Sequence, residues 1–132
     1  MKKVVVLIFL MVAMFTFVNF SRADTNNVSS EVVPGIPVKD IVTLVDLGAK
    51  TCIPCKMMAP ILEELKVEYK GRAEVIFIDV WDAANKEKAK AFKIATIPTQ
   101  VFYNKQGHEV YRHIGFLDKD SIVDKLEALL AE

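Results

Sequence analysis

The chain has 132 residues, of which 52% are hydrophobic and 26% charged, and its 17 basic residues equal its 17 acidic ones. This length suits one domain and leaves no room for two. The balanced charge, with no basic patch along the sequence, argues against a nucleic-acid-binding protein.

The first 23 residues have the layout of a signal peptide. Lys2 and Lys3 precede an uncharged apolar run from Val4 to Val18, and a short polar stretch then ends in the small residue Ala23. The alternative is an uncleaved membrane anchor, but the run is shorter than the roughly 20 residues of a spanning helix. We therefore expect an exported protein, in a bacterial periplasm, cut after Ala23. Cleavage would leave 14 basic against 17 acidic residues.

Residues 24–37 are expected to form a flexible leader before a domain that covers residues 38–132. The leader begins with the polar, turn-rich sequence DTNNVSS from Asp24 to Ser30. Two prolines and a glycine then interrupt the segment Val32–Val38 too often for a helix. This segment is expected either as an edge strand or as a stretch along the surface.

Two cysteines with two residues between them, Cys52 and Cys55, follow the first predicted strand. The apolar run Val42–Leu47 is typical of a buried strand. After Cys55, apolar residues recur at spacings of three and four, which predicts an amphipathic helix to about Tyr69 with Pro54 in its first turn. This spacing brings the two sulfurs close enough to bond, and the N–H groups at a helix start stabilise a thiolate. Cys52 is therefore the expected attacking thiol.

The segment Val45–Leu65, VDLGAKTCIPCKMMAPILEEL, resembles the active-site strand, loop and helix of the thioredoxin family. The resemblance implies that Cys52 attacks a substrate disulfide and that Cys55 resolves the mixed disulfide. It also implies that Asp46, on the preceding strand, assists proton transfer. Asp46 fits this role independently, because burial among apolar neighbours would raise its pKa towards the range useful in acid-base chemistry.

The next predicted elements are a strand and a helix. The helix after the cysteines is expected to stop at Gly71, and Glu74–Val80 has the apolar pattern of a second buried strand. The lysine-rich segment Ala84–Phe92 predicts a helix with a solvated outer face. Between them, we expect Trp81 to pack against the protein rather than to act as a recognition residue on the surface.

A second motif, the sequence IPT at residues 97–99, precedes a further strand. It resembles the loop of thioredoxins that lies against the two cysteines and contains a cis proline, although the sequence alone does not fix the isomer. In that family the backbone before the proline pairs with the substrate peptide. The resemblance therefore implies substrate binding by Ile97 and Pro98, and by Ile53 and Pro54 between the cysteines. Without the cysteines, a tight turn would be preferred.

The end of the chain completes the predicted fold. Gln100–Tyr103 and Glu109–Ile114 are expected as two strands of a hairpin, and a last helix begins within Asp118–Ser121. The resulting order βαβαββα predicts an α/β protein with a central mixed sheet flanked by helices. The resemblance implies that this is the thioredoxin fold, with an N-terminal element that is trimmed relative to many thioredoxins.

The sequence departs from the usual thioredoxin pattern at four positions. Gly48 and Thr51 stand where thioredoxins usually carry tryptophans, and Ile53 replaces a common glycine. Val75 occupies a strand position that often holds a lysine near the buried aspartate. These differences concern the substrate surface and the tuning of Asp46 rather than the chemistry of the cysteines.

Two other uses of the cysteines compete with a redox role. Together with His108 and His113 they would supply four zinc ligands, but the histidines follow Cys55 by more than 50 residues, outside the usual spacing. A permanent structural disulfide would close a loop so small that it constrains the unfolded chain little. The redox role is therefore favoured.

The sequence thus predicts an exported thiol-disulfide oxidoreductase that reduces protein disulfides through a Cys52–Cys55 dithiol/disulfide cycle. A dithiol oxidase or isomerase is an alternative, and so is a non-catalytic binding module with a permanent disulfide. No metal and no cofactor beyond the redox-active disulfide is expected. The expected partners are protein thiols and disulfides and an upstream electron donor, for which a membrane protein is one candidate. We expect a monomer that binds no nucleic acid.

Overall fold

The computed structural model describes residues 33–132. Its strands are β1 (Val42–Gly48), β2 (Ala73–Asp79), β3 (Thr99–Tyr103) and β4 (Glu109–Ile114). Its helices are α2 (Ile53–Glu68), the short 3-10 helix η1 (Ala83–Asn85), α3 (Lys86–Ala91) and α4 (Lys119–Leu130). The predicted signal peptide and most of the predicted leader lie outside the described residues. Within these hundred or so residues, no helix is both long and apolar enough to cross a membrane.

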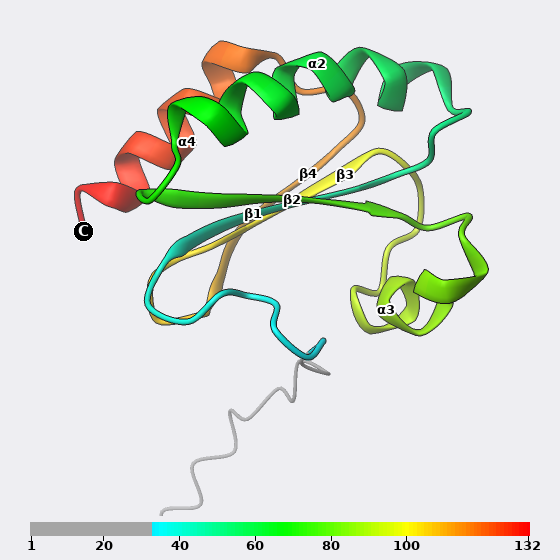
Figure 1. The fold of residues 1–132 in the computed structure, drawn as a ribbon, viewed down its shortest axis with the longest axis horizontal. Coiled ribbons are helices and arrows are strands. Elements are labelled where there is room, and N and C mark those ends of the chain that lie inside the picture. The colour runs from blue at the N-terminus through cyan, green and yellow to red at the C-terminus, as the bar shows by residue number, and fades with distance from the viewer. Residues whose placement is uncertain (1–32) are drawn as a thin grey trace, which may run out of the picture.

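The four strands form one mixed sheet in the order β2-β1-β3-β4. β1 pairs in parallel with β2 and antiparallel with β3, and β3 pairs antiparallel with β4 in the predicted hairpin. Helices α2 and α4 cover one face of the sheet and α3 lies on the other, as Figure 1 shows. This arrangement confirms the predicted βαβαββα order and the thioredoxin fold.

Strand β1 lies at the centre of the sheet, and all seven of its residues are buried. Because successive side chains of a strand point to opposite faces, β1 contributes to two separate cores. Leu44 packs beneath α2 and α4 with Met58 and Phe102. Val45 and Leu47 pack on the other face. A strand covered on both faces is held rigidly, and β1 leads directly to the two cysteines.

The segment before β1 runs along the surface, which was one of the two sequence-based expectations. Within the described chain, no strand precedes β1. Val33 is buried nevertheless, and Ile36 packs beside it against the core on the α3 face of the sheet. Two residues of the expected leader therefore contact the folded domain.

The prediction that Trp81 packs against the protein is wrong. Its side chain is 65% exposed. The chain turns immediately after β2, because the carboxylates of Asp79 and Asp82 accept hydrogen bonds from the backbone N–H groups of Trp81 and Ala84. The turn holds Trp81 beyond the end of the sheet, where no core is available. After this turn, the helix predicted over Ala84–Phe92 is divided into the 3-10 helix η1 and the α-helix α3.

Candidate active site

Cys52 and Cys55 lie where β1 has ended and α2 begins. Cys52 is the N-cap residue of α2, with extended backbone angles, and Pro54 lies in the first turn of the helix as predicted. The backbone N–H of Lys56 donates to the carbonyl oxygen of Cys52 at 3.0 Å, which fixes the first turn around the pair. Both thiols are free in this structure. Cys52 is half-buried and Cys55 is 3% exposed, so only Cys52 is open to a large substrate.

The buried thiol is held in its protonated form. Burial raises the pKa of Cys55, and its hydrogen bond with Cys52 raises this pKa further. The negative charge of Asp46 acts in the same direction, so the carboxyl group lies within electrostatic range of the thiol. Cys55 can therefore react as a nucleophile once a neighbouring group accepts its proton.

Asp46 is fully buried on β1, as the sequence predicted. Burial raises its pKa from 3.8 to about 6, while a hydrogen bond from Gln100 opposes this rise. The Nε2 group of Gln100, on β3, donates to Oδ1 of Asp46 at 2.7 Å. Sequence reasoning missed Gln100. Its burial could have been inferred from the sequence, because Gln100 precedes the apolar Phe102 by two residues and both side chains therefore lie on the same face of β3.

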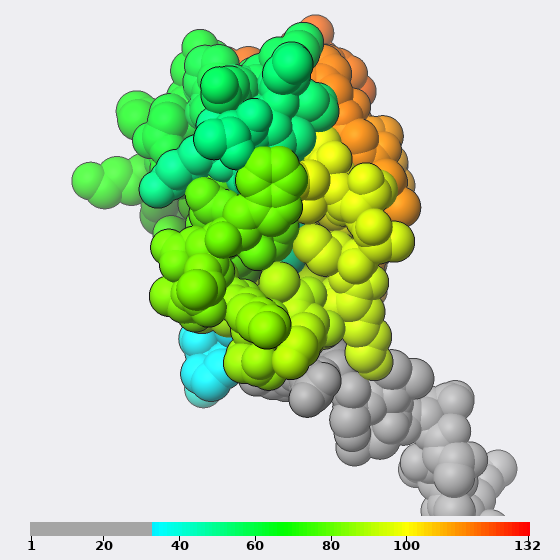
Figure 2. Space-filling model, turned by 90° about the vertical axis from the view of Figure 1, so that its right-hand side faces the viewer, coloured from blue at the N-terminus to red at the C-terminus, as the bar shows by residue number. Residues whose placement is uncertain are grey.

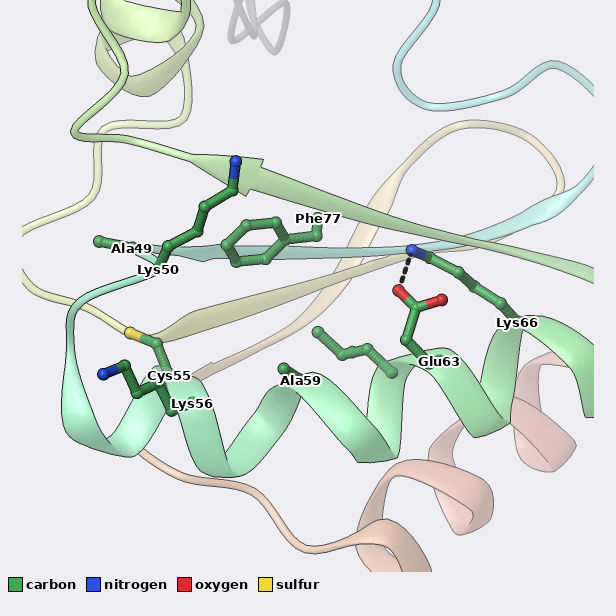
Figure 3. Close-up of a pocket in the computed structure, with 9 residues that line it drawn as sticks. Ala49, Lys50, Cys55, Lys56, Ala59, Glu63, Lys66 and Phe77 are labelled. Atoms are coloured by element: carbon green, nitrogen blue, oxygen red, sulfur yellow. Dashed lines mark hydrogen bonds and ion pairs between the residues drawn. The ribbon is translucent and has the colours of Figure 1, made fainter.

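A cavity of about 270 Å³ lies between α2 and β2. Figure 3 shows Cys55 at one end, the ring of Phe77 as a wall and lysine side chains at the edge. One of these lysines, Lys66, pairs with Glu63 at 2.7 Å. Cys55 therefore lies beside the thiol of Cys52 and also lines a small cavity.

Gly48, the last residue of β1, leaves room for the groups around it. A Cβ atom at this position would lie 3.1 Å from Sγ of Cys55 and 3.1 Å from Cε2 of Phe77. The ring of Phe77 and the buried thiol thus fill the space beside Gly48. A large side chain at this position, where thioredoxins usually carry tryptophan, would have to displace the ring of Phe77 or the thiol of Cys55.

The variant Gly48→Ala is expected to lower the free energy of unfolding by about 1–3 kcal/mol, because the added methyl group presses on Cys55 and Phe77. Urea denaturation of the variant checks this value. Phe77→Leu removes part of the ring, so the double variant should lose less stability than the two single variants together. Strictly additive losses would contradict the packing described here.

The loop before β3 lies at the same end of the sheet as the cysteines. The Ile97–Pro98 peptide bond is cis. Pro98 is buried and Ile97 is half-buried, whereas Ile53 in the first turn of α2 is 75% exposed. Figure 2 faces this end, where the start of α2, the segment after β2 and the loop before β3 lie side by side. The segments that carry the implied substrate-binding residues therefore lie at the same end of the sheet as Cys52, and Pro54 lies half-buried between the two cysteines.

The two histidines lie in the β3–β4 hairpin, away from α2. His108 is exposed, and Nε2 of His113 is 3.2 Å from the carbonyl oxygen of Phe116. In residues 33–132, no three side chains of the types that bind metal ions come together. The zinc arrangement considered from the sequence has no geometry to support it in this part of the chain.

Comparison with known proteins agrees with the fold. The family model described as Thioredoxin matches residues 23–128. A thioredoxin of Staphylococcus aureus is 38% identical over 90 residues, which cover 68% of this chain and 84% of that protein. The structure of chloroplastic thioredoxin z is 30% identical with a TM-score of 0.65, and the match covers 74% of this chain and 86% of that one.

A more distant structure is similar in fold alone. The exposed lipoprotein thioredoxin of Streptococcus pneumoniae has a TM-score of 0.60 at 22% identity, over 69% of this chain and 87% of its own.

Proposed function

Since this chain belongs to the thioredoxin family of thiol-disulfide oxidoreductases, we propose that it reduces protein disulfides outside the cytoplasm through Cys52 and Cys55. The observation that carries the proposal is the pairing of a half-buried cysteine at a helix start with a buried cysteine one turn later. The buried Asp46 lies on the strand that leads to them. These groups supply a nucleophile, a resolving thiol and a proton acceptor.

In the first step, the thiolate of Cys52 attacks one sulfur of a substrate disulfide. The S–S bond of the substrate breaks, a mixed disulfide forms with Cys52, and the other substrate sulfur leaves as a thiolate. Cys52 lies at the N-cap position of α2, beside the first N–H groups of the helix, which have no partner within the helix.

In the second step, Cys55 gives its proton to the carboxylate of Asp46 and attacks the sulfur of Cys52. The mixed disulfide breaks, the second substrate sulfur leaves as a thiolate, and a Cys52–Cys55 disulfide remains. Two electrons have then passed from the cysteine pair to the substrate. Because the pKa of Asp46 is about 6, it is largely ionised near neutral pH and able to accept this proton.

The substrate is held as an extended peptide across the loop before β3. In residues 33–132, no backbone hydrogen bond outside the helices and strands involves Ile97, while the carbonyl oxygen of Pro98 accepts from the N–H of Gly115. A neighbouring peptide can therefore pair with the backbone of Ile97 at the end of the sheet where Cys52 lies. Ile53 and Pro54 supply apolar contacts to this peptide, while Pro98 is buried and shapes the loop that the peptide crosses. Backbone pairing selects little among sequences, which suits a reductase of many proteins.

Residues 1–23 support export, because they combine two lysines, an apolar run and a small residue at the expected cleavage position. A bacterial periplasm is an oxidising compartment, so the oxidised protein must be re-reduced there by a dedicated donor. A membrane protein that passes electrons outward fits this need. We place the reductase there as a monomer, either released after cleavage or held by an uncleaved N-terminal segment.

The reduction potential of the Cys52–Cys55 pair tests the direction of electron flow. The mature protein is equilibrated in buffers of defined thiol and disulfide content, and its free thiols are counted. We expect a value near that of thioredoxin, about −270 mV, because a reductant must hold its electrons weakly. A value near −120 mV would identify an oxidant that donates its disulfide, and the reductase proposal would fail.

A further inference from the structure

Gln100 and Asp46 form a buried polar pair across two strands. The two residues lie opposite each other in the β1–β3 register, so their side chains share the face beneath α2 and α4. Both are fully buried, and the amide nitrogen lies 2.7 Å from Oδ1 of the carboxyl group. This hydrogen bond joins residues 54 positions apart in the sequence.

Only part of the hydrogen-bonding capacity of this buried pair is used. Among the described residues, neither Oδ2 of Asp46 nor Oε1 of Gln100 has a hydrogen-bond partner. A buried polar atom without a partner costs free energy, and two apolar side chains would fill this site without that cost. A pair that lowers stability at the base of the cysteine site is a candidate for a role in its chemistry.

We propose that Gln100 is the positioning residue of Asp46: its amide holds the carboxyl group at Oδ1 and leaves Oδ2 as the oxygen that accepts and returns the proton of Cys55. This inference deepens the proposed function and rests on it. Val75, on the same face of β2 as Phe77, is apolar and offers no donor. The neutral amide of Gln100 is therefore the donor that stabilises the ionised form of Asp46 in this chain.

Other ionisable groups lie near the cysteine site, and a titration has to separate them from Asp46. Cys55 of α2 is coupled electrostatically to Asp46. On β4, His113 is opposite Gln100 in the register. The remaining groups lie at the helix start and around the cavity: Lys50, Cys52, Lys56, Glu63 and Lys66.

The test is the titration of the Asp46 carboxyl carbon by NMR in the reduced full-length protein, without substrate. The variant Gln100→Met keeps the size of the side chain and removes its donor. We expect the midpoint of Asp46 to rise by roughly one pH unit, because the ionised carboxylate loses its one hydrogen bond while the neutral acid loses less. An unchanged midpoint would overturn the proposal.

The control variant is Val101→Ala, the next residue of β3, which packs in the core on the other face of the sheet. It should lower stability and leave the Asp46 midpoint unchanged. A similar rise in both variants would show that Gln100 acts through packing alone and would also overturn the proposal. If Gln100→Met does not fold, Gln100→Leu provides the same comparison. The titration uses no substrate, so its result is independent of whether the protein reduces disulfides.

Discussion

Cys52→Ser is expected to abolish the reduction of insulin disulfides, with a fall in rate of at least about a thousandfold. A serine hydroxyl is not ionised near neutral pH and does not exchange with disulfides, so the first step has no nucleophile. Cys55 does not replace it, because that thiol is buried and protonated. The measurement is the turbidity of precipitating insulin chains, with dithiothreitol as the source of electrons.

The matched control is Cys55→Ser, which removes the same atom one turn later in α2. This variant keeps the first step and loses the second, so it should accumulate a mixed disulfide with insulin that is visible on a non-reducing gel. The double variant should show no such product. Substantial insulin reduction by Cys52→Ser would refute the assignment of the attacking thiol. A Cys55→Ser protein that traps nothing would instead favour a non-catalytic binding module.

Asp46→Asn is expected to raise the free energy of unfolding at pH 7 by up to about 3 kcal/mol while it slows the second step of reduction. The folded-state pKa of about 6 is higher than the ordinary value of 3.8. Between these two values the unfolded chain has lost its proton while the folded protein still holds it. Unfolding therefore becomes easier as pH rises from about 4 to 6, and the loss is complete above that range. Asparagine carries no charge and avoids this loss.

Urea denaturation at pH 7 and at pH 3.5 checks this prediction. The gain from Asp46→Asn should be largest at pH 7 and should be small at pH 3.5, where the aspartate is protonated in the folded protein and mostly protonated in the unfolded chain. Asp124→Asn makes the same chemical change at an exposed position of α4 and should leave stability almost unchanged. An equal gain from Asp46→Asn at both pH values would show that burial of the charge is not its cause.

The local elements of this fold follow from the sequence because their signals are local. The apolar run of β1 and the three- and four-residue spacing of α2 each lie within one stretch of chain, and both elements end within about one residue of their predicted bounds. Capping at Asp118 also fits the predicted start of α4, since its carboxylate accepts from the N–H of Ser121. The burial of Asp46 was predictable for the same reason.

Features that depend on distant parts of the chain were not predictable in this way. The exposure of Trp81 depends on a turn that carries it past the end of the sheet. The hydrogen bond of Gln100 depends on the register between β1 and β3. The contact of Phe77 with the space beside Gly48 depends on how β2 pairs with β1. In each case the sequence identifies the residue but not the distant parts of the chain that surround it in the folded protein.

The long separation between Asp46 and Gln100 also affects how the protein matures during folding. The two cysteines are neighbours in the sequence, so their sulfurs can meet in a chain that has not yet folded. The hydrogen-bonded pair of Asp46 and Gln100 forms only after β3 has docked against β1, a step that must close a long loop. A newly made chain can therefore bring its two thiols together before the hydrogen bond from Gln100 has fixed the carboxylate of Asp46.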